Sequence, residues 1–325
     1  MNTRRALSSS LALLAATACG WPAGSAIAQP VPADFPARPI RVVVPYAVGG
    51  ADLYVRALQA VLDRRGGPTL VVESVVGAGG TVGAGRVKRA APDGYTLLFT
   101  GTGALTIAPR LQGDNLSPAD FAPVISLLNI PYVVALRKGS PIRNPADFIA
   151  YVKAHPGALD YGSPGIGSAP HLAMEALGTR LGASMTHIPF TGISVAVQAL
   201  LGGHIDAVIG APSNVLPQVA GGQLQAIGVT GRTRSALFPE LPTFVESGAD
   251  VEVTTHFGFL APAGTPRAVI ERLAALFGAA AADEAFLASM EKMQTNVEVL
   301  PAAAFSKALA AESAYFAPLV ARMKP

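Results

Sequence analysis

The sequence contains a single cysteine, Cys19, close to its N-terminus. The rest of the chain therefore has no disulfide, no thiolate nucleophile and no cysteine metal ligand. Histidine is also scarce, and the five residues never occur as H-x-x-x-H or H-E-x-x-H, which leaves a helix-borne zinc site without support. We expect neither a metal nor a cofactor.

Charge and nucleotide-binding motifs are also sparse. Only 14% of the residues are charged, and no run of lysine or arginine occurs, which excludes a nucleic-acid partner. No G-x-S-x-G or G-K-[ST] motif is present, and Tyr161-Gly162-Ser163-Pro164-Gly165 is the nearest approach to a nucleophile elbow. Gly101-Thr102-Gly103 begins like a dinucleotide-binding turn but lacks the third glycine. These absences argue against an enzyme.

The N-terminus has the features of an export signal. Arg4 and Arg5 precede an apolar run over residues 7–18, which is too short to span a bilayer. An A-x-A pattern ends at Ala28, so we expect residues 1–28 to be removed and the protein to reach the periplasm. Cys19 slightly resembles a lipoprotein cysteine, but Ala16 stands where leucine is usual. No later apolar run approaches 18 residues, so we expect a soluble mature protein.

The remaining sequence alternates short apolar runs with helical periodicity, which is typical of an α/β protein with a largely parallel sheet. Strands are predicted at 40–44, 70–75, 96–100, 133–136, 186–189, 207–209, 226–229 and 297–300. Helices are predicted at 53–62, 81–91, 146–154, 171–181, 194–201, 214–220, 269–282, 284–293 and 302–322. A chain of 325 residues favours two lobes. The pattern changes near 127–132 and 254–258, which predicts a discontinuous first lobe.

Two glycine-rich turns stand out between predicted strands and helices. One includes Tyr46, Ala47, Val48, Gly49, Gly50 and Asp52, and the other includes Ser163, Pro164, Gly165, Gly167 and Ser168. Such turns expose main-chain N–H groups at a helix N-terminus, where an anion is favoured. The alternative is that Asp52 and Ser168 only cap their helices, with Asp52 also paired with Arg56 four residues later.

Several motifs together resemble the tripartite tricarboxylate transporter receptor family, the Bug or TctC-type periplasmic solute-binding proteins. They are the run 41–52, Gly77-Ala78-Gly79-Gly80, Ala91-Pro92-Asp93-Gly94-Tyr95, Gly165-Ile166-Gly167-Ser168-Ala169-Pro170-His171, Leu201-Gly202-Gly203-His204-Ile205-Asp206 and Phe257-Gly258-Phe259-Leu260-Ala261-Pro262. The likeness covers essentially all of the chain after the signal, in order.

This resemblance implies an α/β, two-lobed periplasmic-binding-protein fold (type II) with a ligand cleft between the lobes. Lobe 1 would comprise residues 29–128 plus 256–325, and lobe 2 residues 129–255. The two glycine-rich turns would bind a ligand carboxylate, and Thr102, Phe190, Thr191 and Gly192 would form further walls. Asp206 matches a family aspartate near the cleft, with a turn residue before the next strand as the alternative. His171 matches a family position too, which we interpret as support for the turn or as helix packing.

The sequence departs from the family pattern in the first turn and in the predicted wall. The first turn is one residue shorter than usual, and Phe190-Thr191-Gly192 replaces the common Tyr-Lys-Gly, which removes two hydrogen-bond donors. With Ile193, this change favours a ligand that has an apolar or aromatic body.

The resemblance implies a monomeric receptor that captures a small organic carboxylate and delivers it to membrane transporter subunits. The alternatives are a periplasmic protein that presents the ligand to a sensor domain, and an exported α/β enzyme.

Overall fold

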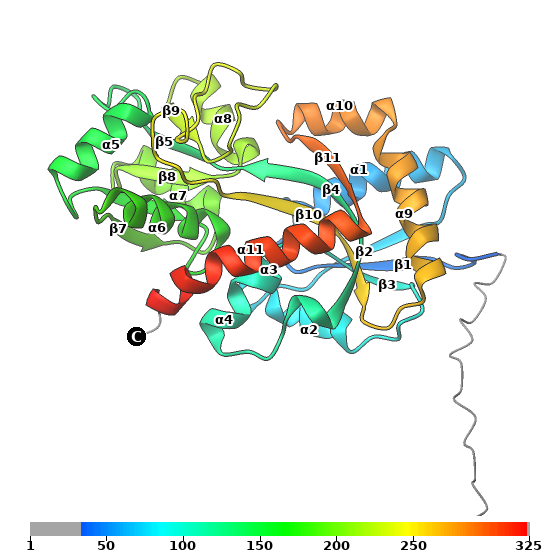
Figure 1. Ribbon diagram of the computed structural model, residues 1–325. Helices are drawn as coiled ribbons and strands as arrows, with labels where there is room; N and C mark the ends of the chain where they lie inside the picture. The colour runs from blue at the N-terminus through cyan, green and yellow to red at the C-terminus, as the bar shows by residue number, and fades with distance from the viewer. Residues whose placement is uncertain (1–33, 324–325) are drawn as a thin grey trace, which may run out of the picture. The chain divides into compact units, whose positions relative to one another are not determined.

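A computed structural model describes residues 34–323, whose strands form two mixed sheets (Figure 1). The first sheet has the order β11-β4-β10-β3-β1-β2, with β1 (Ile40–Val44), β2 (Leu70–Ser74), β3 (Thr96–Gly101), β4 (Phe121–Pro131), β10 (Thr254–Pro262) and β11 (Val297–Pro301). The second has the order β7-β6-β8-β5-β9, with β5 (Val133–Arg137), β6 (Asp160–Ser163), β7 (Thr186–Pro189), β8 (Ala207–Gly210) and β9 (Leu224–Val229).

The helices are grouped here by the sheet whose strands precede or follow them in the chain. Those of the first are α1 (Ala51–Arg64), η1 (Ala78–Gly80), α2 (Thr81–Lys88), α3 (Gly103–Thr106), α4 (Ala108–Gln112), η2 (Pro118–Asp120), α9 (Arg267–Ala281), α10 (Glu284–Lys292) and α11 (Ala302–Met323). Those of the second are α5 (Pro145–Ala154), α6 (Ala169–Leu181), α7 (Ile193–Leu201) and α8 (Pro212–Ala220). In α1, buried Val55, Leu58 and Leu62 recur at helical spacing and pack in the core of the first sheet.

The expectation of a largely parallel sheet is correct for part of each sheet only. Strand β1 pairs in parallel with β2 and β3, and β6 pairs in parallel with β7 and β8. Strand β10, however, is antiparallel to both β3 and β4, and β5 is antiparallel to β8 and β9. The sequence did not predict β4, because it is buried along most of its length and lacks the alternation that identifies a half-buried strand.

The chain passes between the sheets at two places that are hydrogen-bonded to each other. Tyr132 alone separates β4 from β5, and its N–H donates to Thr230 Oγ1 over 2.9 Å. The Thr230 N–H donates back to Tyr132 O over 3.0 Å, and the Val253 N–H donates to Thr230 O over 3.0 Å. The Tyr132 hydroxyl also bonds that of Thr255. The division into lobes at 128/129 and 255/256 stays a prediction.

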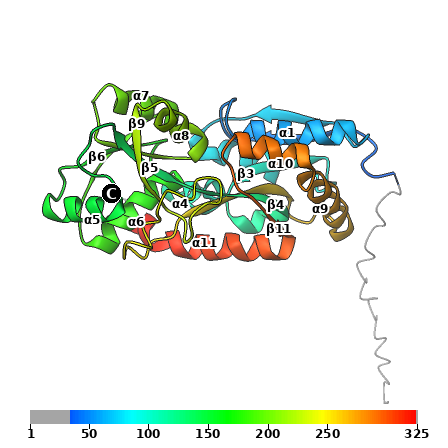
Figure 2. The same cartoon turned by 90° about the horizontal axis from the view of Figure 1, so that it is seen from above.

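Helix α11 contacts the cores of both sheets. Phe305 and Leu309, in its first half, pack with side chains from β1, β3 and β10. Phe316 and Val320, in its second half, pack with side chains from β5, β8 and α6. Figures 1 and 2 show this helix (red) extending from β11 toward α6. The last helix therefore joins the two halves of the fold.

Among residues 34–323, no single helix is both long and apolar enough to cross a membrane. Helices α9 and α10 meet those criteria only as a pair, and they are bent by 69° with respect to each other. Their buried residues, including Phe277 and Phe286, belong to the core of the first sheet.

Candidate functional site

The first glycine-rich turn follows β1 and precedes α1. The Tyr46 hydroxyl bonds Thr100 Oγ1 over 2.9 Å, and its ring centroid lies 6.3 Å from that of Phe257. Burial of this phenol raises its pKa above the ordinary value. Tyr46 is thus fixed to the first sheet, whereas Ala47, Val48, Gly49 and Gly50 are exposed, and the side chain of Val48 is 70% accessible.

Asp52 is fully buried and binds the turn that precedes it. Its Oδ1 accepts hydrogen bonds from the N–H groups of Gly49 (2.8 Å) and Gly50 (2.9 Å). Its Oδ2 lies 3.2 Å from Nε of Arg56, which confirms the predicted pair. The N-cap of α1 is Gly50, so the expectation that Asp52 caps this helix is wrong. Two amides that we expected to face a ligand carboxylate are already bound by the protein's own carboxylate.

The second glycine-rich turn joins β6 to α6 and is stabilised by hydrogen bonds among its own residues. Ser168 is the N-cap of α6 and accepts from the His171 N–H, as the capping alternative predicted, while its hydroxyl donates to Gly165 O over 2.8 Å. Ser163 is fully buried at the end of β6. Gly165 and Gly167 have φ angles of +130° and +77°, which L side chains rarely adopt, so both positions require glycine.

The predicted wall around Phe190 lies against this second turn. The Phe190 N–H donates to Ser163 O over 3.2 Å, and a Cβ at Gly165 would lie 3.2 Å from Phe190 O. Thr191 is exposed, and Phe190 and Gly192 are half-buried. The structure therefore places Phe190 beside Ser163 and Gly165, and Thr191 and Gly192 follow it in the chain.

Thr102 follows β3 and connects it to β10 and α11. Its N–H donates to His256 O over 3.1 Å, and the adjacent Gly103 approaches α6 so closely that a Cβ there would lie 3.8 Å from the Ala169 Cβ. The Thr102 hydroxyl bonds Glu312 of α11, and Thr106 Oγ1 donates to the same carboxylate over 3.0 Å. Burial raises the pKa of Glu312 to about 7, although the two hydroxyls oppose this shift.

Two polar residues next to the predicted site were missed by sequence reasoning. Glu312 lies 210 positions after Thr102, and no local motif connects them. His187 on β7 lies with Nε2 2.7 Å from Ser163 Oγ. The register that sets Tyr161 opposite His187 could have indicated this contact, but the pairing of β6 with β7 had first to be known.

His187 and His171 remain neutral at physiological pH. Burial lowers the pKa of His171 to about 3, with a further decrease from the neighbouring His187, and burial alone lowers the pKa of His187 to about 4. The pairing of Ser163 with His187 resembles a nucleophile and its base, but Ser163 has no exposed surface. A substrate therefore has no access to this hydroxyl.

Asp206 lies at the amino ends of the parallel strands of the second sheet, away from the second turn. It immediately precedes β8, and its Oδ2 accepts from the Asp160 N–H at the start of β6 over 2.9 Å. Because β6 and β8 are parallel, Asp206 lies at their amino ends, whereas Ser163 lies at the carboxyl end of β6. The turn-residue alternative accounts for these contacts, so we remove Asp206 from the proposed site.

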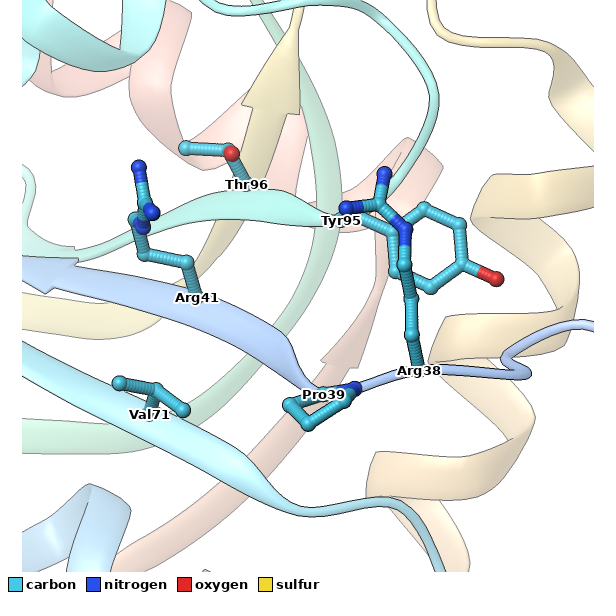
Figure 3. A pocket seen from close by; sticks show the side chains of 6 residues that line it. All are labelled: Arg38, Pro39, Arg41, Val71, Tyr95 and Thr96. Carbon is cyan, nitrogen blue, oxygen red and sulfur yellow. The ribbon is translucent and has the colours of Figure 1, made fainter.

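A pocket of about 240 Å³ lies at the amino ends of β1 and β3 (Figure 3). Its walls include Arg38, whose guanidinium carbon is 3.9 Å from the ring centroid of Tyr95, and Arg41, which pairs with Glu73 over 3.0 Å. Ligands of open α/β sheets bind beyond the carboxyl ends of the strands, where the two glycine-rich turns are. We therefore do not assign the ligand site to this pocket.

Among the described residues, no group of three histidine, cysteine, aspartate or glutamate side chains is arranged to hold a metal ion. The structure brings the second turn into contact with Phe190 and with Ile107 and Leu111, which follow β3. Tyr46 of the first turn bonds Thr100 at the end of β3.

Comparison with known proteins places this arrangement in a family. The family model for the tripartite tricarboxylate transporter family receptor matches residues 54–323. A protein of Cupriavidus necator, described as the UPF0065 protein in the gbd 5' region, is 38% identical over 241 residues, which are 74% of this chain and 73% of that protein.

Solved structures of this kind superimpose over most of both chains. The periplasmic binding protein BugD is 33% identical, with a TM-score of 0.76 over 89% of this chain and 98% of its own. MatC (Rpa3494) from Rhodopseudomonas palustris with bound malate is 29% identical, with a TM-score of 0.76 over 88% of this chain and all of its own. These matches confirm the α/β periplasmic-binding-protein fold. The chain therefore belongs to the tripartite tricarboxylate transporter receptor family, whose members are solute-binding receptors rather than enzymes.

Proposed function

We propose that this receptor captures a small organic carboxylate between its two sheets in the periplasm and delivers it to the membrane subunits of a tripartite transporter. The second turn is the main support for this proposal. It begins a helix of 13 residues, it contains no lysine or arginine, and it contacts Ile107 and Leu111, which follow β3 of the other sheet. Main-chain donors at such a helix start favour an anion.

The hydrogen bonds of the turns indicate which donors the ligand would use. The amides of Gly49, Gly50, Gly165, Gly167 and Ser168 all have partners inside the protein. Among the described residues, those of Ala47, Val48 and Ile166 have none. We therefore assign the direct contacts to these exposed amides, and we assign Asp52 the task of shaping the first turn.

Exposed apolar side chains lie on both turns and on the segment that follows the Phe190 wall. Val48 is 70% exposed, Ile166 is 67% exposed and Val195, at the start of α7, is 51% exposed, whereas Phe190 is half-buried beside Gly165. Burying such side chains against a ligand contributes about 25 cal/mol per Å² of apolar surface. A monocarboxylate with a branched or aromatic body would use this surface, as the loss of the usual Tyr-Lys-Gly also predicts.

The remaining expectations belong to the same proposal. Export with cleavage after Ala28 and the alternative of lipidation at Cys19 concern residues 1–33, which lie outside the described residues. The lobes at 29–128 plus 256–325 and at 129–255, and the monomeric state of the receptor, also stay predictions.

Native mass spectrometry of freshly purified protein, followed by calorimetry, tests the proposal. The panel comprises malate, succinate, adipate, citrate, isobutyrate and benzoate. We expect at least one carboxylate to bind, and a ligand present at 100 times its dissociation constant should add about 2.7 kcal/mol to the free energy of unfolding. Citrate binding much more tightly than isobutyrate and benzoate would contradict the apolar preference. Retention of a ligand without any carboxyl group would contradict the proposal as a whole.

A further inference from the structure

Two histidines are stacked directly beneath the second turn. His171 comes from the first turn of α6 and is only 3% exposed, whereas His187 comes from β7. Their ring centroids are 3.7 Å apart, and the ring planes differ by 19°. A pair of imidazolium ions at this separation would repel strongly. The stacked pair therefore requires at least one neutral ring.

His171 accepts a hydrogen bond from the second turn. The Gly167 N–H donates to Nδ1 of His171 over 3.1 Å. Because Nδ1 accepts, the proton of the neutral ring lies on Nε2, which is 3.9 Å from Oε1 of Glu175. That carboxylate also accepts from the Tyr161 hydroxyl over 2.8 Å. These contacts assign the Nε2–H tautomer to His171.

His187 contacts the other end of the same turn. Its Nε2 is 2.7 Å from Ser163 Oγ, which accepts from the Gly165 N–H over 3.1 Å and lies 3.2 Å from Gly165 O. An Nε2–H tautomer satisfies all three contacts, because His187 then donates to Ser163 and the serine hydrogen goes to Gly165 O. In the Nδ1–H tautomer, Nε2 would accept the serine hydroxyl hydrogen, and Ser163 could then not donate to Gly165 O.

We propose, on the basis of the function proposed above, that His171 and His187 are positioning residues of the carboxylate site. One ring holds the Gly167 amide, and the other holds the Gly165 amide through Ser163. The Ile166 amide, between them, is thereby left open at the exposed tip of the turn. Because both rings are neutral, they fix the turn without placing a cation beside the ligand.

Four variants separate the loss of a hydrogen bond from the loss of a ring. His171→Asn and His187→Gln keep an amide near the position of the ring nitrogen that bonds, whereas His171→Leu and His187→Leu remove it. His155→Leu is the matched control, because His155 is exposed at the end of α5, contacts Tyr151 of that helix, and precedes the amino end of β6, whereas the turn follows the carboxyl end.

The first measurement needs no ligand. Side-chain ¹⁵N NMR of the unliganded protein at pH 7 should show both histidines as neutral Nε2–H tautomers. Amide exchange at Gly167 should become at least tenfold faster in His171→Leu than in the wild type, and amide exchange at Gly165 should become at least tenfold faster in His187→Leu. In His171→Asn, His187→Gln and His155→Leu, both exchange rates should stay within threefold of those in the wild type. An imidazolium at either position, an Nδ1–H tautomer of His171, or unchanged exchange in both leucine variants would overturn the proposal.

The second measurement is calorimetry with the carboxylate of the panel that binds the wild type most tightly. Each leucine variant should bind about tenfold more weakly, and the Asn, Gln and control variants within threefold of the wild type. Equal binding by all five variants would overturn the proposal even where a carboxylate binds. If no carboxylate binds the wild type, the function proposed above fails, while the NMR result still decides whether the histidines hold the turn. A leucine variant that misfolds is detected by circular dichroism, and the tautomers of the wild type then decide.

Discussion

Oε1 of Glu312, in the last helix, accepts a hydrogen bond over 3.0 Å from the hydroxyl of Thr106, which lies 206 positions earlier. This contact and the one with Thr102 connect α11 to the turn that meets α6. Glu312 as a whole is half-buried, and burial of its carboxyl group raises the pKa of that group to about 7. Ionisation of Glu312 should therefore make the stability of the fold depend on pH.

We expect stability to decrease between about pH 4.5 and pH 7 because of Glu312. Its folded-state pKa lies above the ordinary value of 4.5, so the unfolded chain loses this proton first and the folded state is penalised as the pH rises. Glu312→Gln should remove this dependence. The difference in unfolding free energy between this variant and the wild type should shift by about 1 kcal/mol in favour of the variant from pH 4.5 to pH 8. This is less than the nominal 1.4 kcal/mol per pKa unit would give, because Glu312 is partly exposed. Urea unfolding at both pH values checks this. A parallel pH dependence in the two proteins would contradict it.

The stacked histidines predict a loss of stability in acid. The pKa values of His171 and His187 are lowered to about 3 and about 4, so the unfolded chain takes up protons below about pH 6.5 that the folded chain does not. The contribution of the two neutral rings to stability should be complete above pH 6.5 and should fall steadily toward pH 4, which is the direction opposite to that of Glu312. The Glu175 carboxyl group and the Tyr161 ring are the other groups that face this pair.

The test is thermal unfolding from pH 7 to pH 4 of the wild type and of the double variant His171→Asn/His187→Gln. The double variant should lose less stability over this range, because two groups that titrate in the unfolded chain are absent. Equal losses in both proteins would show that other groups control acid unfolding.

Asp52 and Arg56 should have unequal effects, although they form one ion pair. Asp52→Ala leaves the amides of Gly49 and Gly50 without their acceptor, so we expect a cost of about 1–3 kcal/mol and a carboxylate affinity at least tenfold weaker. Arg56→Ala removes only a partner that is 56% exposed, so we expect at most about 1 kcal/mol and little change in affinity. Calorimetry and urea unfolding of both variants check this. Loss of binding in Arg56→Ala alone would mean that a cation holds the carboxylate.

Gly167→Ala should be strongly destabilising for two separable reasons. The residue has a φ of +77°, and a Cβ would lie only 2.3 Å from Leu111 Cδ1. We expect about 1–3 kcal/mol in total, and Leu111→Ala in the same chain should relieve the overlap but not the backbone strain. A double-mutant cycle with urea unfolding measures the relief. Strictly additive effects would show that Leu111 does not restrict this position.

The sequence predicted the elements with clear periodicity and missed those without it. Helix α11 was expected over 302–322 and runs over Ala302–Met323, because its apolar residues recur at helical spacing. Strand β4 was missed because a mostly buried strand lacks alternation. The antiparallel insertion of β10 beside β3 depends on pairing between distant segments, which a local pattern does not contain.

For the site, the sequence identified the turns but not the partners of their donors. The glycines at 165 and 167 indicated a turn, and Ser168 indicated the start of α6, since both are local rules. That Asp52 already binds two amides of the first turn requires the three-dimensional path of that turn. The same holds for His187, which reaches Ser163 only because β7 pairs with β6.

The dual packing of α11 determines when folding can be completed. The core of the second sheet includes Phe316 and Val320, although every strand of that sheet ends before residue 230. The two groups of packed side chains that contain residues of α11, one on each sheet, therefore stay incomplete until this helix has been synthesised. Such a delay keeps apolar segments unpacked during synthesis. For a protein that has to be threaded through a membrane before it folds, as we propose here, this order of assembly keeps the chain fit for translocation.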